Sequence, residues 1–168
     1  VGMLALQLVP ATVNLIPYYK MMVKLNLLNT LIGLILIYTA MRIPFSTWIL
    51  KAYYDSLPQS LMDAALIDGC SHFRVFWNIM LPLSLPGIGA AGFLSFLGGW
   101  GEFLIPLTIA SNRDVSVISV GLYAFFGGEI QVYNLLFAAS VIATAPVLIA
   151  FLLSQETFIS GLTAGSGK

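Results

Sequence analysis

The chain has 168 residues, of which 59% are hydrophobic and 8% charged, with a formal net charge of zero and a mean hydropathy of +0.95. Soluble domains carry about 25% charged residues, so this chain lacks a surface suited to water and is predicted to lie in a membrane. The balanced charge argues against a nucleic-acid partner, because no basic patch is available to release counterions. Cys70 is the only cysteine, which excludes an internal disulfide, and no cysteine–histidine spacing indicates a metal site.

Four apolar stretches are long enough to cross a bilayer, whose core of about 30 Å needs about 20 helical residues. They run from the start of the chain to about residue 19, and over about residues 29–50, 86–110 and 135–153. A soluble all-α core would need polar faces at the helical period, which these stretches lack. The predicted fold is therefore all-α, a polytopic bundle of transmembrane helices.

The start of the chain is unusual, because Val1 opens directly into an apolar run without an initiator methionine or the basic n-region of a signal peptide. We therefore expect the chain to be a fragment that lacks its N-terminal sequence. Charge does not set its orientation, since the positive-inside rule finds three basic residues on each side of the predicted spans. These are Lys51, Arg74 and Lys168 on one side, and Lys20, Lys24 and Arg113 on the other.

Residues 51–82, between the second and third spans, form the main polar segment and are predicted to fold as two short helices joined by a bend. Ser56 and Gln59 have the form of a capping box at the start of the first helix. Gly69 is the usual residue for the left-handed end of such a helix, and Ser71 is a suitable cap for the second. The second helix has apolar residues at helical spacing: Phe73, Phe76, Trp77 and Met80.

The polar face of this segment is acidic, because Asp63 and Asp68 lie beside Ala64 and Ala65. One interpretation is an amphipathic helix pair resting among lipid headgroups, although such helices usually carry lysine and arginine. The other is a helix that docks into a groove of a cytosolic protein. The residues alone leave both interpretations open.

Ionisable residues inside predicted spans are candidates for function. Glu102, between Trp100 and Phe103 in the third span, either lines a solute pathway or lies at the outer interface, bonded to neighbouring helices. Trp100 offers an aromatic ring beside it, although tryptophan is common at interfaces in any case. Arg42, in the second span, either joins an internal ion pair or extends to a headgroup.

The polar segment also carries a spaced motif: Asp63-Ala64-Ala65, three residues, Gly69, nine residues, Ile79, one residue, and Leu81-Pro82. This motif resembles the signature of permease subunits of binding-protein-dependent ABC importers, in which Glu-Ala-Ala occupies the first three positions. The one departure is aspartate for glutamate at position 63, which keeps the charge and shortens the reach.

The flanking sequence resembles the carbohydrate-importer branch of that family and is similar to the smaller subunit of the maltose permease. The third-span motif of the branch is often Trp-Asn-Glu-Phe, and Gly101 stands here at the position of the asparagine. The other matching segments are Ile16-Pro17-Tyr18-Tyr19, Leu27-Leu28-Asn29-Thr30, Ile43-Pro44-Phe45 and Gly161-Leu162-Thr163-Ala164-Gly165.

The resemblance implies the MetI-like permease fold of six transmembrane helices, with four spans in this chain and the N-terminal two missing. Residues 1–168 would then be the C-terminal two-thirds of a transmembrane domain in a bacterial or archaeal plasma membrane, with the C-terminus in the cytoplasm. The loop at 51–82 would be cytoplasmic and would hold the coupling helix for an ATPase. The implied docking residues are Asp63, Ala64, Ala65, Asp68, Gly69, Ile79, Leu81 and Pro82.

The implied partners are an ABC ATPase dimer, a second permease subunit, an extracytoplasmic solute-binding protein and membrane lipid. ATP would be bound by the ATPase, so we expect no catalytic residue, metal or cofactor in this chain. The expected solute is a sugar or a related compound, and the candidate pathway residues are Arg42, Trp100, Glu102 and Phe103. The alternatives are an ABC importer for a non-sugar solute, a secondary transporter or channel, and a scaffold that docks a protein other than an ATPase.

Overall fold

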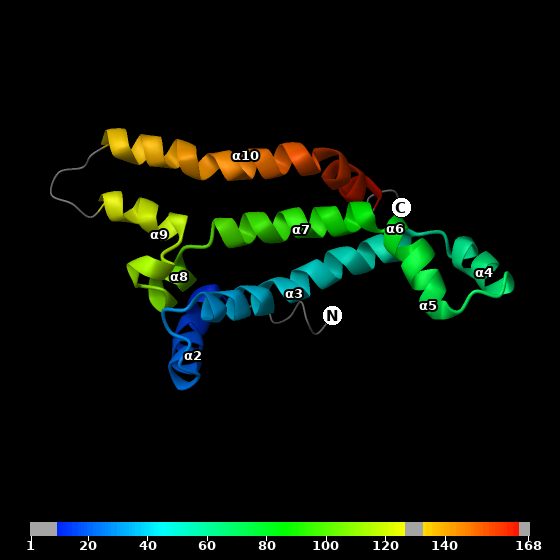
Figure 1. Cartoon of the computed structure of the whole chain (residues 1–168), viewed down its shortest axis with the longest axis horizontal. Coiled ribbons are helices and arrows are strands. Elements are labelled where there is room, and N and C mark those ends of the chain that lie inside the picture. The colour runs from blue at the N-terminus through cyan, green and yellow to red at the C-terminus, as the bar shows by residue number, and fades with distance from the viewer. Residues whose placement is uncertain (1–9, 127–132, 165–168) are drawn as a thin grey trace. The chain divides into compact units, whose positions relative to one another are not determined.

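A computed structural model of the chain describes residues 10–126 and 133–164 (Figure 1). In these two ranges every regular element is helical, which confirms the all-α prediction. The chain divides into two compact units. Unit 1 comprises Val1–Phe45 and Phe96–Ile149, and unit 2 comprises Ser46–Ser95 and Ala150–Lys168.

Within the described ranges, five helices are at least nine residues long, and shorter elements connect them. The long helices are α2 (Ala11–Lys24), α3 (Leu31–Ser56), α4 (Gln59–Ile67), α7 (Leu85–Trp100) and α10 (Tyr133–Ala164). The short α-helices are α5 (His72–Val75), α6 (Leu81–Leu83), α8 (Leu104–Ile109) and α9 (Ile118–Tyr123). A π-helical turn, η2, covers Phe76–Met80, and 3₁₀ turns cover Arg113–Val115 (η3) and Ala124–Phe126 (η4).

Two described helices are long and apolar enough to span a membrane individually: Leu31–Ser56 and Tyr133–Gln155. A bent pair, His72–Leu83 with Leu85–Trp100, is a third candidate. Only 17% and 6% of the most apolar windows of the two individual helices are buried within the chain. Their outer faces are therefore suited to lipid or to other subunits, as expected of the predicted second and fourth spans.

The other two predicted spans differ from the structure or fall partly outside its described ranges. The predicted third span was wrong at its end, because α7 stops at Trp100 and the separate helix α8 follows Phe103. The helix closes in a turn, in which the Gly101 N–H donates to the Leu97 carbonyl at 3.1 Å and the Glu102 N–H donates to the Gly99 carbonyl at 3.3 Å. The first predicted span includes residues 1–9, which lie outside the described residues. The rest of it lies mainly in α2, which continues beyond the predicted end at about residue 19 to Lys24.

Unit 1 has an apolar core built from α2, α3 and α8. Its buried members are Met22, Leu34, Ile37, Ile105, Ile109 and Ala110. Asn29 fixes the turn before α3 to the end of α8, because its side-chain oxygen accepts from the Ser111 hydroxyl at 3.3 Å and from the Asn112 backbone N–H at 3.1 Å. Asn29 has φ +55°, a left-handed conformation that asparagine adopts more readily than most residues.

Candidate functional site

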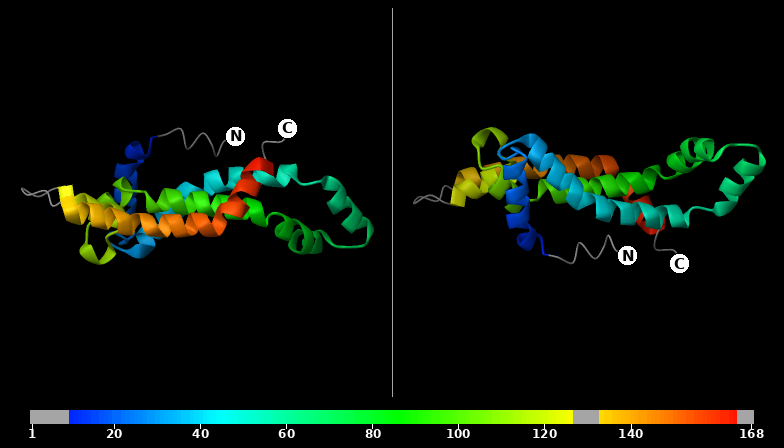
Figure 2. Two further views of the ribbon diagram at one scale, coloured as in Figure 1. Left: turned by 90° about the horizontal axis from the view of Figure 1, so that it is seen from above. Right: turned by 90° about the horizontal axis from the view of Figure 1, so that it is seen from below.

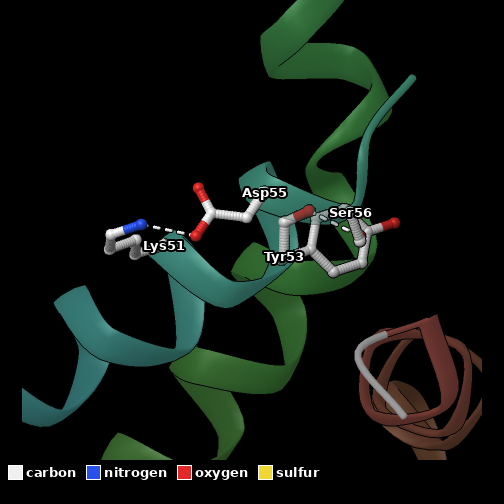
Figure 3. Close-up of polar contacts among 4 residues, drawn as sticks. All are labelled: Lys51, Tyr53, Asp55 and Ser56. Carbon is white, nitrogen blue, oxygen red and sulfur yellow. Dashed lines mark hydrogen bonds and ion pairs between the residues drawn. The ribbon is translucent and has the colours of Figure 1, made fainter. Parts of the chain in front are cut away.

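The polar segment begins later than the sequence predicted, because α3 continues through Ser56. Lys51 and Asp55 form an exposed ion pair one helical turn apart on this extension (Figure 3). The capping-box prediction for Ser56 is wrong: its hydroxyl donates to the Tyr53 carbonyl at 2.6 Å and so serves the end of α3. A serine that is still helical bonds readily to a carbonyl in its preceding turn. The residue before α4 is Pro58, which makes no side-chain cap.

The bend between α4 and α5 has the geometry that the sequence predicted. Gly69 adopts φ +81°, and the Gly69 and Cys70 N–H groups donate to the carbonyls of Leu66 and Ala65 at 3.1 and 3.0 Å. This pair of bonds is the Schellman motif, which satisfies the last carbonyls of a helix. Ser71 then caps α5 by accepting from the Arg74 N–H at 3.3 Å. Both views in Figure 2 show the chain reversing between α4 and α5.

Three of the four residues of the predicted apolar face of the second helix are exposed, and the fourth, Met80, is half-buried. Phe73 and Trp77 are 72% and 51% exposed, and Phe76 is also exposed. Trp77 contacts both phenylalanines edge to face, with ring centroids 6.0 Å from Phe73 and 5.6 Å from Phe76. We call Phe73, Phe76 and Trp77 the aromatic surface. Exposed apolar groups of this kind mark interaction sites.

The motif residues lie in different environments. Asp63, Ala64, Asp68 and Gly69 are exposed, whereas Ala65 is buried and supports α4 from its inner side. The later motif residues lie where the loop returns to α7: Ile79 and Leu81 are half-buried and Pro82 is exposed. The structure thus brings the first part of the motif to a solvent-facing bend and the last part to the loop's root.

The candidate pathway residues of the third span lie in unit 1, and two of them are engaged with their own chain. The indole N–H of Trp100 donates to the Ala143 carbonyl at 3.0 Å. The Phe103 ring lies 5.1 Å from that of Tyr123. Glu102 is half-buried, and its backbone carbonyl accepts from the Ser119 hydroxyl at 2.6 Å. These contacts anchor residues 100–103 on both sides of the point where α7 ends.

Arg42 also lies in unit 1, half-buried against α7. Its guanidinium occupies the space beside Gly98, where a Cβ atom would lie 2.6 Å from Nη2. Neither Arg42 nor Glu102 forms an ion pair with any residue that the structure describes. The Tyr38 hydroxyl is buried without a hydrogen-bond partner in that part of the chain.

Sequence reasoning missed Tyr38 and Gly98 as neighbours of Arg42. The only signal for Tyr38 is its position four residues before Arg42, which places both on one face of α3. Nothing in the sequence distinguishes Gly98 from the many other glycines of this segment as a neighbour of Arg42. Within the two described ranges, no three histidine, cysteine, aspartate or glutamate side chains are grouped as a metal site would require.

Comparison with known proteins gives consistent similarities over nearly the whole chain. The family model described as "Binding-protein-dependent transport system inner membrane component" matches residues 2–163. The chain is 36% identical to the sulfoquinovosyl glycerol transport system permease protein SmoH of Agrobacterium fabrum, over 98% of this chain and 58% of that protein. It is 36% identical to the arabinooligosaccharides transport system permease protein AraQ of Halalkalibacterium halodurans, with the same coverage.

A third relative is the maltodextrin transport system permease protein MalD of Streptococcus pneumoniae, which is 34% identical over 98% of this chain and 59% of that protein. The chain therefore spans less than two-thirds of the length of each of these three relatives.

Proposed function

Since the chain belongs to the family of binding-protein-dependent transport system inner membrane components, we propose that it is part of a permease subunit of an ATP-driven importer. Residues 1–168 would form part of the transmembrane domain and contribute to one half of a translocation pathway. The chain is a transport subunit and not an enzyme, and ATP is bound and hydrolysed by a partner ATPase. The remaining partners are a second permease subunit and an extracytoplasmic solute-binding protein.

The proposed solute is a sugar or sugar derivative. This assignment is supported by the relatives, which are named for the transport of sulfoquinovosyl glycerol, arabinooligosaccharides and maltodextrin. Arg42, Trp100, Glu102 and Phe103 are the proposed pathway residues. Half-buried Arg42 and Glu102 are the strongest of these, because charged groups within a membrane are costly unless they serve a polar pathway.

The observation that carries the proposal is the aromatic surface on the loop between α3 and α7. A helix that rests among anionic headgroups would place lysine and arginine beside its apolar face. Here the exposed charges of the loop are of both signs, since they include Asp63 and Asp68 as well as Arg74. Exposed aromatic rings on a loop without an excess of basic residues are better suited to a groove on a protein than to anionic lipid, and aromatic residues often dominate binding energy at such interfaces.

This docking role sets the proposed orientation. If the loop contacts an ATPase, it lies in the cytoplasm. One crossing by α7 and one by α10 then return the chain to the same side, so the C-terminus is also cytoplasmic. The short elements η3 and α9, between those crossings, would face the solute-binding protein.

The test is co-purification of the cognate ATPase with the affinity-tagged, full-length permease, followed by solute uptake in cells. Trp77→Ala removes the centre of the aromatic surface and is expected to weaken ATPase binding by about 30-fold or more, as for a typical interface hot spot. Trp48→Ala is the matched control, because Trp48 lies in α3 with 52% exposure, against 51% for Trp77.

Three results would contradict the proposal. Equal loss of ATPase from both tryptophan variants would show that the aromatic surface is not the docking site. Capture of a different protein in place of the ATPase would indicate a scaffold. Uptake that persists without the ATPase and collapses with a proton ionophore would indicate a secondary transporter.

A further inference from the structure

The return from the loop to the membrane helices contains a broken helix, and the break itself lies within unit 2. The segments His72–Leu83 and Leu85–Trp100 differ in direction by 64°, and Ser84 lies between them. Pro86 accounts for the break, because proline has no N–H to donate to the Pro82 carbonyl and its ring clashes with that carbonyl. Ser84 itself is fully buried, with 0% exposure.

Two consecutive tyrosines near the end of α3 bind this break. The Tyr54 hydroxyl lies 3.0 Å from Oγ of Ser84, which donates to the Leu81 carbonyl at 2.9 Å. Since serine has one hydroxyl proton, Tyr54 is the donor to Ser84. The Tyr53 hydroxyl donates to the Leu83 carbonyl at 3.3 Å. Side chains of α3 thus donate hydrogen bonds to the Ser84 hydroxyl and the Leu83 carbonyl, at the last turn before the bend.

On the other side of the bend, α3 and α7 are also packed closely together. Tyr53 is buried against Gly87, where a Cβ atom would lie 2.5 Å from Cγ of the tyrosine. Only glycine allows α7 to approach the ring this closely. We call Tyr53, Tyr54, Ser84 and Gly87 the tyrosine junction. It joins α3, α6 and α7 at the root of the loop.

We propose that Tyr53 and Tyr54 are positioning residues that make the loop, the end of α3 and the start of α7 move as one body. This inference rests on the proposed function, in which an ATPase displaces the loop. A helix broken by proline has lost a hydrogen bond, so its own backbone holds the bend less firmly than an unbroken helix would. The two tyrosines oppose movement at the bend, so that a displacement of α5 and α6 reaches α3 and α7 together.

The experiment measures movement within unit 2 directly. Spin labels are placed at Asn78→Cys, on the loop, and at Gly92→Cys, on α7, in the full-length permease with Cys70 replaced by serine. Asn78 is exposed, and a Cβ at Gly92 meets no heavy atom within 4 Å. The label-to-label distance is measured by pulsed electron paramagnetic resonance in nanodiscs containing the assembled transporter, without nucleotide and after trapping with ADP and vanadate.

The test variant is Tyr53→Phe with Tyr54→Phe, which removes both hydroxyls and keeps both rings. The control is Ser95→Ala, which removes the 2.9 Å hydrogen bond between Ser46 and Ser95 that joins α3 and α7 away from the loop. Trapping is expected to leave the distance unchanged in the parent and the control. In the double variant we expect a shift larger than the half-width of the parent distribution, because the loop then moves without α7.

An unchanged distance in the double variant, or an equal shift in Ser95→Ala, would overturn the inference. A purely structural role for the tyrosines would lower the yield of assembled transporter without this nucleotide-dependent shift. Failure of the proposed function has a different signature, namely that no ATPase co-purifies with the parent. In that case the measurement without nucleotide still tests the tyrosine junction. A broader distance distribution in the double variant than in the parent supports the junction, and an equal width refutes it.

Discussion

Replacing a glycine of α7 by alanine should have opposite effects at two positions of the same helix. Within a helix, glycine to alanine is worth about 1 kcal/mol of added stability. At Gly92 nothing lies within 4 Å of the new Cβ, so Gly92→Ala should keep this gain. At Gly87 the new Cβ would lie 2.5 Å from Cγ and 2.9 Å from Cβ and Cδ1 of Tyr53.

The overlap at Gly87 cannot be relieved by rotating the tyrosine, since its Cβ is fixed by the backbone of α3. Carbon atoms pack best at about 3.5–4.0 Å, and overpacking a core typically costs about 1–3 kcal/mol. The propensity gain is common to both variants, so the difference between Gly87→Ala and Gly92→Ala should equal the overpacking cost of about 1–3 kcal/mol.

The assay is titration of the full-length subunit in mixed micelles with a denaturing detergent, which gives the free energy of unfolding. We expect Gly87→Ala to unfold more readily than Gly92→Ala, and the difference to shrink when Tyr53 is also replaced by alanine, which removes Cγ and Cδ1. If Gly87→Ala is as stable as Gly92→Ala, the close approach of α7 to α3, and with it the tyrosine junction, is refuted.

Substitutions at three further positions test other parts of the structure. Gly69→Ala forces a side chain into a left-handed backbone, which costs about 1–2 kcal/mol, and it should lower the affinity for the ATPase by up to about 30-fold. Gly69→Asn should lower this affinity less, and equal affinities of the two variants and the parent would contradict the role of the bend. Asn29→Ala should destabilise the subunit by about 2–4 kcal/mol in the same unfolding assay, because it affects both the left-handed turn and two hydrogen bonds. Asn29→Gly keeps the turn and should therefore destabilise the subunit by about half as much. An Asn29→Ala variant with unchanged stability would exclude the turn as an anchor for α8. Glu102→Gln should reduce the maximal uptake rate by about 10-fold or more without changing ATPase co-purification, as expected for a charge that lines a pathway; unchanged uptake would assign Glu102 to structure alone.

The features that were predictable from the sequence are those set by neighbouring residues. Gly69 and Ser71 act through hydrogen bonds to residues within five positions, so their caps follow from local chemistry. Ser56 also acts through nearby residues, but its hydroxyl has two possible uses: to cap α4 or to donate to the carbonyl of Tyr53 at the end of α3. The extension of α3 through Ser56 decides between them, and Tyr53 on that extension packs against Gly87 of α7.

Contacts between distant residues could not be predicted in this way. Tyr54 and Ser84 are 30 positions apart, and both are ordinary residues for a membrane segment. The approach of Arg42 to Gly98 likewise gives no pattern in a single sequence, because a glycine that accommodates a side chain resembles a glycine that permits helix packing. The end of α7 at Trp100 was missed since hydropathy continues through Leu104 and Ile105 after the break.

The most direct test of the central claim is photo-crosslinking from the aromatic surface in cells. A benzophenone amino acid replaces Phe73, the most exposed ring of that surface, and in a separate strain it replaces Trp48 in α3. After irradiation, mass spectrometry identifies the crosslinked partner. We predict that position 73 yields an adduct with an ABC ATPase and that position 48 does not. An adduct of position 73 with lipid alone, or the same partners from both positions, would contradict the assignment of this loop as the ATPase contact.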